Sequence, residues 1–200
     1  MADSSWSIAL VLLAQSGDRD AMNRLLSEVQ ADLYRYLVQL AGDKHLAEDI
    51  LQDVFVLIWR KLRWLRTPEV FRPWVYRISS REAFRRLKKQ RVETRKLGKK
   101  TDLAAIPADE IHSLPLEWAE SLSALLDSLP PASRAVLILH YVHGMTLNEV
   151  ADVLEISPGT VKSRLAYGLA TLRQKIRPDG SSPSTPAVSP STYPPEGSFR

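Results

Sequence analysis

The stretch Thr146-Leu-Asn-Glu-Val-Ala-Asp-Val-Leu-Glu-Ile-Ser-Pro-Gly-Thr-Val-Lys-Ser-Arg-Leu-Ala-Tyr167 predicts two short helices joined by a tight turn. Thr146 can cap the first helix, and Glu149 three residues later completes a capping box. Ser157 can cap the second helix, and Pro158 then takes its first position, where no backbone N–H is needed. Such a pair is either a helix-turn-helix that enters a DNA major groove or an ordinary helical hairpin.

The second helix of this pair has one apolar side and one polar, basic side. Its apolar stripe follows helical spacing and consists of Val161, Leu165, Leu169 and Leu172. The residues left facing outward are Lys162, Ser163, Arg164 and Tyr167. A basic outer face favours DNA binding, but the rest of the chain has to decide between the two interpretations.

Charge is distributed unevenly over the 200 residues, although the net charge is only +4. Bases crowd between Arg60 and Lys100, whereas acids predominate before and after this block. A segregated basic block indicates a polyanion partner, and acidic stretches indicate a protein partner. The chain has no cysteine, and its longest apolar run, Ile8 to Ala14, is far shorter than the ~20 residues of a membrane span. We therefore expect a cytoplasmic protein without membrane insertion.

Hydrophobic periodicity predicts an all-α protein made of two small helical domains. Helices are expected over 21–40, 45–62 and 74–91, and Thr67-Pro68 and Pro73 predict a loop over 63–72. The boundaries follow from composition. They give a first domain at 6–95, a flexible linker at 96–116, a second domain with the helix-turn-helix at 117–177 and a disordered Pro/Ser-rich tail at 178–200.

The helix expected over 74–91 carries a basic face suited to phosphates. Arg77, Arg81, Arg85 and Lys88 recur at three- or four-residue spacing. Aromatic and basic residues precede or begin this helix, namely Phe71, Arg72, Trp74 and Tyr76. Rings stack on unpaired bases, so the combination indicates melted DNA or RNA rather than intact duplex. The alternative is that Trp74 only anchors the helix in the core and that the charges are solvated.

The helix expected over 45–62 carries a different, acidic and apolar face. Its residues are Asp49, Gln52, Asp53, Val56 and Trp59. Carboxylates repel phosphate, so this face suits a protein partner, with Trp59 as a candidate anchor. The alternative is that Trp59 is buried and the acids are merely solvated.

Catalytic chemistry has little support in the sequence. His140 and His143 lie three residues apart, but no carboxylate follows at a metalloenzyme spacing. His45, Glu48, Asp49 and Asp53 are more typical of a solvated or partner-binding helix face than of an active site. We therefore expect no enzyme activity, no metal and no cofactor.

Four segments, in this order, resemble those of bacterial sigma factors of the extracytoplasmic-function group, the small two-domain branch of the sigma-70 family. They are Ala47–Arg60, Phe71–Ile78, Leu129–Leu137 and Gly144–Leu172. The resemblance implies that Asp49, Gln52, Asp53 and Trp59 contact the clamp helices of the largest-subunit family of core RNA polymerase. It also implies that the loop Leu65–Arg72 captures a flipped −10 base.

The same resemblance assigns both DNA-contacting helices. Residues Arg77, Ser80, Arg81 and Arg85 would lie beside the melted −10 strand. Residues Pro158, Thr160, Lys162, Ser163, Arg164 and Tyr167 would form the −35 recognition helix. The chain departs from the family's usual pattern at Ser79-Ser80-Arg81 and at Arg85, which makes the −10 helix more basic. An anti-sigma factor is a further possible partner.

The expected function is therefore that of a non-catalytic specificity subunit, which binds core RNA polymerase and directs promoter-specific initiation. Two rival interpretations remain at this point. One is a helix-turn-helix regulator that binds duplex DNA without joining polymerase. The other is an interaction protein that has kept the fold without initiating transcription.

Overall fold

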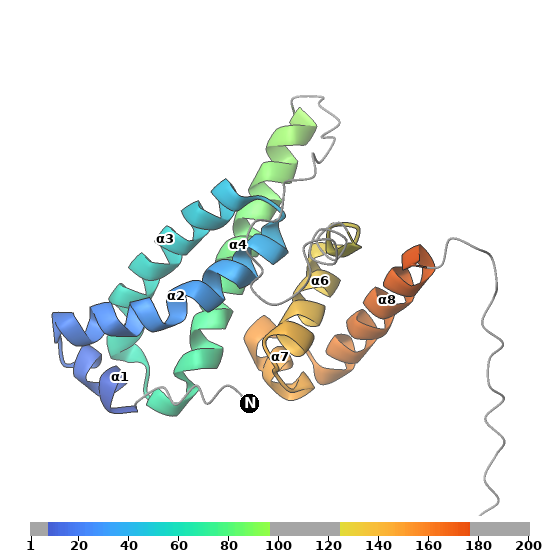
Figure 1. The fold of residues 1–200 in the computed structure, drawn as a ribbon. Coiled ribbons are helices and arrows are strands. Elements are labelled where there is room, and N and C mark those ends of the chain that lie inside the picture. Colours follow the sequence, from blue (N-terminus) through green and yellow to red (C-terminus); the bar gives the residue numbers. More distant parts are fainter. Residues whose placement is uncertain (1–7, 97–124, 177–200) are drawn as a thin grey trace, which may run out of the picture.

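The computed structural model describes residues 8–96 and 125–176, and these residues form helices and turns with no β-strand among them. Two groups of helices lie side by side, α1 to α4 in the first and α6 to α8 in the second (Figure 1). The prediction of an all-α fold in two helical domains is confirmed. The predicted tail and all but the first residue of the predicted linker lie outside the described residues.

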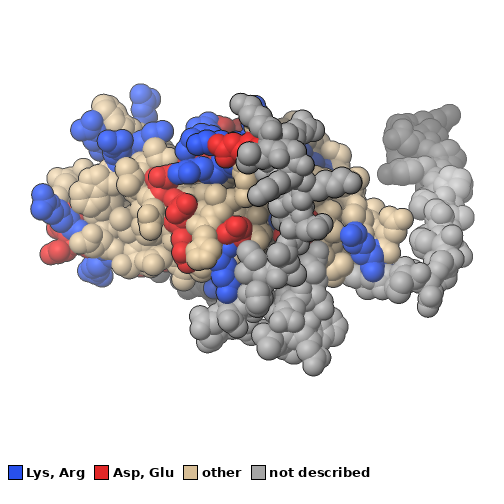
Figure 2. Space-filling view, turned by 90° about the horizontal axis from the view of Figure 1, so that it is seen from above, with Lys and Arg blue, Asp and Glu red and all other residues tan. Residues whose placement is uncertain are grey.

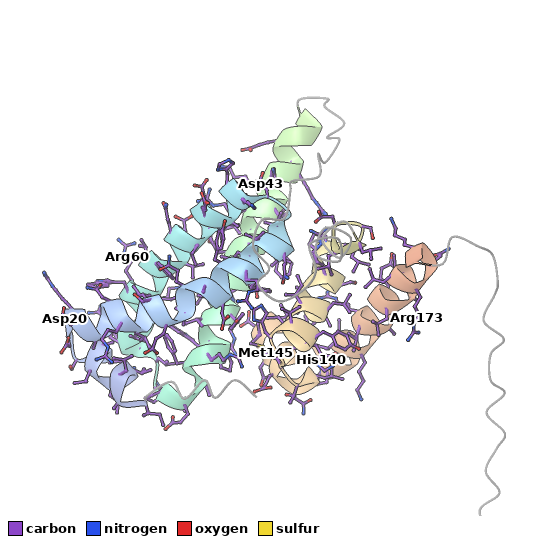
Figure 3. All side chains as sticks on the ribbon, in the orientation of Figure 1. Asp20, Asp43, Arg60, His140, Met145 and Arg173 are labelled. Carbon is purple, nitrogen blue, oxygen red and sulfur yellow. The ribbon has the colours of Figure 1, made fainter. Side chains whose placement is uncertain are left out.

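The first domain consists of α1 (Ile8–Gln15), α2 (Arg19–Ala41), α3 (Lys44–Lys61) and α4 (Phe71–Lys96). Side chains fix where two of these helices begin, because Asp18 accepts a hydrogen bond from Ala21 N and Asp43 accepts one from Leu46 N. Asp43 lies between α2 and α3 (Figure 3). Gly42 ends α2 with φ +70°, a left-handed conformation that glycine adopts without steric strain. The two-residue turn from α2 into α3, Gly42-Asp43, is thus set by local sequence.

The segment expected as a loop over 63–72 is more regular than predicted. It contains two short 3₁₀ helices, η1 (Leu62–Trp64) and η2 (Pro68–Val70), and α4 already begins at Phe71. The expectation that Pro73 interrupts a helix was wrong. Pro73 lies in the first turn of α4, where backbone N–H groups have no partner within the helix, so its missing N–H breaks no bond.

The second domain consists of a short helical turn at 125–127, α6 (Pro131–Leu137), a π-helical turn η3 (Ile138–Val142), α7 (Leu147–Leu154) and α8 (Pro158–Ile176). The predicted capping box is confirmed, because Thr146 N donates to Glu149 Oε2 at 2.8 Å and Glu149 N donates to Thr146 Oγ1 at 3.2 Å. Ser157 Oγ accepts from Thr160 N at 3.1 Å at the start of α8. The stretch therefore forms two capped helices joined by a turn.

Gly168 lets α8 pack closely on α6. A Cβ atom at this position would lie 2.7 Å from Leu137 Cδ1, closer than a real side chain tolerates. Val161 on the same helix is fully buried, whereas Lys162, Ser163 and Tyr167 on its other side are exposed. In the part of the chain that the structure describes, no helix is long and apolar enough to cross a membrane.

Candidate DNA and polymerase interfaces

The outer face of α3 brings together four of the five residues predicted for polymerase binding. Asp49, Gln52, Val56 and Trp59 lie at positions i, i+3, i+7 and i+10, and all four are exposed. Trp59 is 49% exposed and Val56 is 52% exposed, so these apolar groups are presented to solvent rather than buried. We call this surface the α3 face.

The fifth residue, Asp53, points toward α4 and is half-buried. Its carboxylate accepts a hydrogen bond from Arg86, which also donates to Glu82 at 3.2 Å. Glu82 is buried and also forms an ion pair with Arg85. Asp53 therefore joins α3 to α4 in an ion-pair network, a role that sequence spacing did not reveal because its partner lies 33 residues away.

Three residues predicted to contact −10 DNA are buried in this structure. Phe71 is 0% exposed, and Tyr76 and Ser80 are each 2% exposed. The Ser80 hydroxyl is hydrogen-bonded to the Tyr36 hydroxyl at 2.7 Å, and burial raises the pKa of the Tyr36 phenol. Direct contact of these three side chains with DNA stays a prediction, and it would require the surrounding groups to move apart.

Three basic residues that were also predicted to contact −10 DNA donate hydrogen bonds to the second domain. Arg72 Nη2 donates to His143 O at 2.9 Å, and Arg77 Nε donates to Asp152 O at 3.0 Å. Arg81 Nε donates to Glu155 Oε2 at 2.7 Å. These contacts join residues more than 70 positions apart and hold α4 against the end of α7 and against the turn at His143 that follows η3.

His143 lies inside the seam between the two domains. Its Nδ1 atom is hydrogen-bonded to the Tyr76 hydroxyl at 2.8 Å, and the two rings stand 5.0 Å apart. Tyr36 packs edge-on to both rings. Burial lowers the pKa of His143 to about 4, so the imidazole is neutral near pH 7.

His140, the other histidine of the pair considered for metal binding, makes a separate contact, from Nδ1 to Met145 O at 2.7 Å (Figure 3). In the resolved ranges 8–96 and 125–176, no three His, Cys, Asp or Glu side chains are grouped as metal ligands would be.

The remaining residues of the basic helix stay on the surface. Trp74 is partly buried and packs against the core, which fits the alternative of a core anchor. Arg85 and Lys88 are exposed. Figure 2 shows acidic side chains in a narrow band with clusters of Lys and Arg nearby, so both signs of charge occur on the side of the molecule drawn there.

The outer face of α8 presents most of the residues predicted for −35 DNA. Pro158, Lys162, Ser163 and Tyr167 are exposed, and Tyr167 reaches 55%. Arg164 and Thr160 are half-buried, and Thr160 takes part in the helix cap through Ser157. A capped helix that keeps its polar side free, with a short helix packed behind it, has the arrangement of a helix-turn-helix.

Comparison with known families accounts for both domains. The family described as "Sigma-70 region 2" matches residues 25–93, and "Sigma-70, region 4" matches residues 119–172. The ECF RNA polymerase sigma factor SigL of Mycobacterium tuberculosis is 30% identical over 85% of this chain and 97% of the relative. The chain belongs to the extracytoplasmic-function sigma factors. It is thus an RNA polymerase sigma factor that directs promoter-specific transcription.

Other relatives and solved structures agree with this assignment. The sigma factor SigW of Bacillus subtilis is 27% identical over 82% of this chain and 92% of the relative, and ShbA of Streptomyces griseus is 31% identical over 82% and 92%. The sigma factor RpoE of Bartonella quintana, solved in complex with the anti-sigma factor NepR, has a TM-score of 0.68 at 23% identity and covers 78% of this chain and 97% of its own. CnrH, solved with the cytosolic domain of CnrY, has a TM-score of 0.64 at 23% identity over 86% and 97%. At this identity the two structures show a shared fold.

Several structurally important residues of this sigma factor were missed by sequence reasoning. Glu82 and Arg86 organise the network behind the α3 face, and Glu155 pairs with Arg81 across the domains. Arg134 is buried in the last turn of α6 and donates to Asp127 Oδ1 at 2.8 Å. For Arg134 the available signal was a charged residue directly flanking the apolar stretch Ala135 to Leu139, because a buried charge requires a partner. No comparable local signal marks Glu82, Arg86 or Glu155, which lie among other charged or exposed residues.

Proposed function

We propose that this sigma factor docks on the clamp helices of core RNA polymerase through the α3 face, holds the melted −10 strand along α4 and reads −35 duplex with α8. The observation that carries the proposal is the outer side of α8. There Lys162, Ser163 and Tyr167 are exposed while Val161 on the opposite side is fully buried. Such a face can approach base edges in the major groove without disturbing the core.

The α3 face supports the polymerase part of the proposal. It pairs exposed apolar groups, Val56 and Trp59, with the polar Asp49 and Gln52, a mixture typical of the centre and rim of a protein interface. Asp53 would support polymerase binding indirectly, because its ion pair with Arg86 holds α3 against α4 and so fixes the position of the α3 face.

The −10 part of the proposal rests on the basic residues of α4 and on the loop before it. Arg77, Arg81, Arg85 and Lys88 would neutralise phosphates, and the loop Leu65–Arg72 would receive an extruded base. Contacts that form only with the extruded base would offset an unstacking cost of a few kcal/mol. Phe71, Tyr76 and Ser80 support α4 from inside in this structure, and their predicted contact with the strand would require the groups around them to move apart.

The sigma factor would act in the cytoplasm as a binding subunit without catalytic activity of its own. The relatives RpoE and CnrH were solved with partner proteins, RpoE with an anti-sigma factor. We include an anti-sigma factor of this kind among the proposed partners of this chain.

Runoff transcription with purified core polymerase tests the proposal. Wild-type protein should yield promoter-specific transcripts, and Asp49→Arg or Trp59→Ala should lose both transcription and co-elution with core polymerase. Glu28→Arg, a matched charge reversal at an exposed position on α2, should behave as wild type. We avoid Asp53→Arg because it would place a cation beside Arg86 and confuse docking with folding.

The outcomes separate the rival interpretations. A duplex-only regulator would retard promoter DNA but give no specific runoff with core polymerase, and an interaction protein would do neither. If Asp49→Arg transcribes as well as Glu28→Arg, the α3 face is not the docking surface.

A further inference from the structure

The end of α3 and the turn that follows it form a basic surface around an exposed tryptophan. Its cations are all exposed, namely Arg60, Lys61, Arg63 and Arg66. The ion pairs of the described residues involve none of these four. The end of α3 lies at the edge of the first domain away from α6 to α8 (Figure 1). We call these four residues together with Trp64 the η1 surface.

Trp64 supplies the aromatic ring of the η1 surface. It is 70% exposed, the highest value among the exposed large hydrophobic residues of the described chain. The Arg63 guanidinium lies over this ring, 4.8 Å from its centroid, where a cation is attracted to the face of an aromatic system. One face of the ring therefore carries a cation, and the high exposure leaves the other face accessible to a flat partner.

The turn that carries Trp64 is held in place from α1. Gln15 Nε2 donates to Leu62 O at 2.9 Å and to Leu65 O at 2.7 Å, so one side chain fixes both ends of η1. Leu65 N also donates to Leu62 O at 3.0 Å, and Leu62 is fully buried. A fixed turn reduces the conformational entropy that is lost on binding, so the ring of Trp64 is presented in advance to a partner.

The charge of α3 changes sign along the helix, and this indicates the kind of partner. Asp49 lies on the α3 face in the first half of the helix, whereas Arg60 and Lys61 lie in its last turn. The helix dipole favours cations in a last turn, which accounts for these two residues. Arg63 and Arg66 lie beyond the helix, so the dipole does not account for them. A phosphate backbone matches their charge, and it would be repelled by the acidic part of α3.

We propose that the η1 surface binds the unpaired promoter strand beside the extruded base, with Trp64 stacking on one base and Arg63 and Arg66 contacting phosphates. An unpaired base exposes a flat face to an aromatic ring, which a base inside a duplex does not. The inference rests on the proposed function, because the loop Leu65–Arg72, which would receive the extruded base, begins directly after Trp64. It adds a stacking residue that lies outside this loop and outside α4.

Binding of the full chain to a fluorescein-labelled single-stranded DNA 15-mer of mixed sequence measures this contact. The duplex of the same 15-mer with its complement is the second probe. Trp64→Ala removes the ring, Trp64→Phe keeps an aromatic face, and Trp64→Leu keeps apolar bulk without such a face. Arg63→Gln and Arg66→Gln each remove one charge. Arg24→Gln, at an exposed position on α2, is the matched control for loss of an arginine.

Trp64→Ala should weaken binding of the single strand by roughly 5- to 150-fold, the range for one stacked base, and leave binding of the duplex unchanged. Trp64→Phe should retain most of the wild-type affinity, whereas Trp64→Leu should match Trp64→Ala. Arg63→Gln and Arg66→Gln should each reduce the steepness of log affinity against log salt by about 0.7, the value for one phosphate contact on a single strand. Trp64→Ala and Arg24→Gln should leave that steepness unchanged.

The inference and the proposed function fail in different ways. Equal affinity of Trp64→Ala and wild type for the single strand, or an equal loss on single strand and duplex, refutes stacking on an unpaired base. If the Trp64 variants keep strand affinity but lose co-elution with core polymerase, the η1 surface is a protein contact and the inference is overturned. The proposed function fails instead if wild type with core polymerase gives no promoter-specific runoff. Circular dichroism should show equal helix content in all variants, because Trp64 lies outside the core.

Discussion

Acidification should open the seam between the two domains through His143. In the closed arrangement burial lowers the pKa of this imidazole to about 4. The charged groups that act on it are Asp32 and Arg35 on α2 and Arg72 on α4: the carboxylate raises the pKa and both arginines lower it. Tyr76 is the neutral partner of its Nδ1 atom. Separation of the domains would return the ring to water and its pKa toward 6.5.

The direction and size of the effect follow from this difference. Above pH 7 the ring is neutral in both arrangements, so pH has no influence through it. Below pH 6.5 the open form takes up a proton that the closed form excludes until about pH 4, so closure weakens as pH falls. At pH 5 the penalty on closure amounts to about 2 kcal/mol, or roughly 30-fold in the open-to-closed ratio. The loss levels off below pH 4.

Energy transfer between two dyes can follow this change between pH 7.5 and pH 5. The chain has no cysteine, so Asn23→Cys on α2 and Gln174→Cys on α8, both at exposed positions, supply one labelled pair, and a closed seam should give high transfer. His143→Gln removes the titrating ring but keeps an amide that can pair with the Tyr76 hydroxyl, so its closed population should vary little over the same range. Circular dichroism should show unchanged helix content in both proteins. The reasoning fails if the wild-type ratio is constant over this range, or if His143→Gln opens just as steeply.

Other substitutions give further expected outcomes. Arg134→Met should lower the free energy of unfolding by about 3 kcal/mol in urea melts, because it leaves the Asp127 carboxylate without its buried partner; equal stability would contradict a structural role for the pair. Gly42→Ala should lower the free energy of unfolding by about 1–2 kcal/mol, because φ is +70° and the new Cβ would lie 2.8 Å from Asp127 Oδ1. Gly17→Ala is the control for the effect of the backbone conformation alone, because φ is +98° there and no atom lies near the new Cβ. Lys162→Ala should weaken binding to −35 duplex by about 1–3 kcal/mol at one base position if it reads a base, and a uniform loss on all sequences would instead indicate a phosphate contact.

Local sequence patterns predicted the helices and their ends because these depend on neighbours within four residues. The capping box of Thr146 and Glu149 and the cap by Ser157 are of this kind. The same argument located the α3 face, since exposed residues three and four apart share one side of a helix. It failed at Pro73, where the rule that proline interrupts helices was applied without allowing for the first turn.

Sequence alone determined that this protein has two helical domains, a capped helix-turn-helix and a basic helix after Phe71. Hydrophobic periodicity and helix capping depend only on residues a few positions apart, so they can be recognised in short stretches of sequence. The tertiary structure decided which of the basic residues face solvent. It also decided which polar residues are buried. The sequence leaves Ser80 either on a solvated face or in a buried polar layer, and its hydrogen bond to the Tyr36 hydroxyl, from a helix 44 residues away, places it in the buried layer. The pairing of Arg81 with Glu155 spans 74 residues and depends on how two domains pack, which no local pattern encodes.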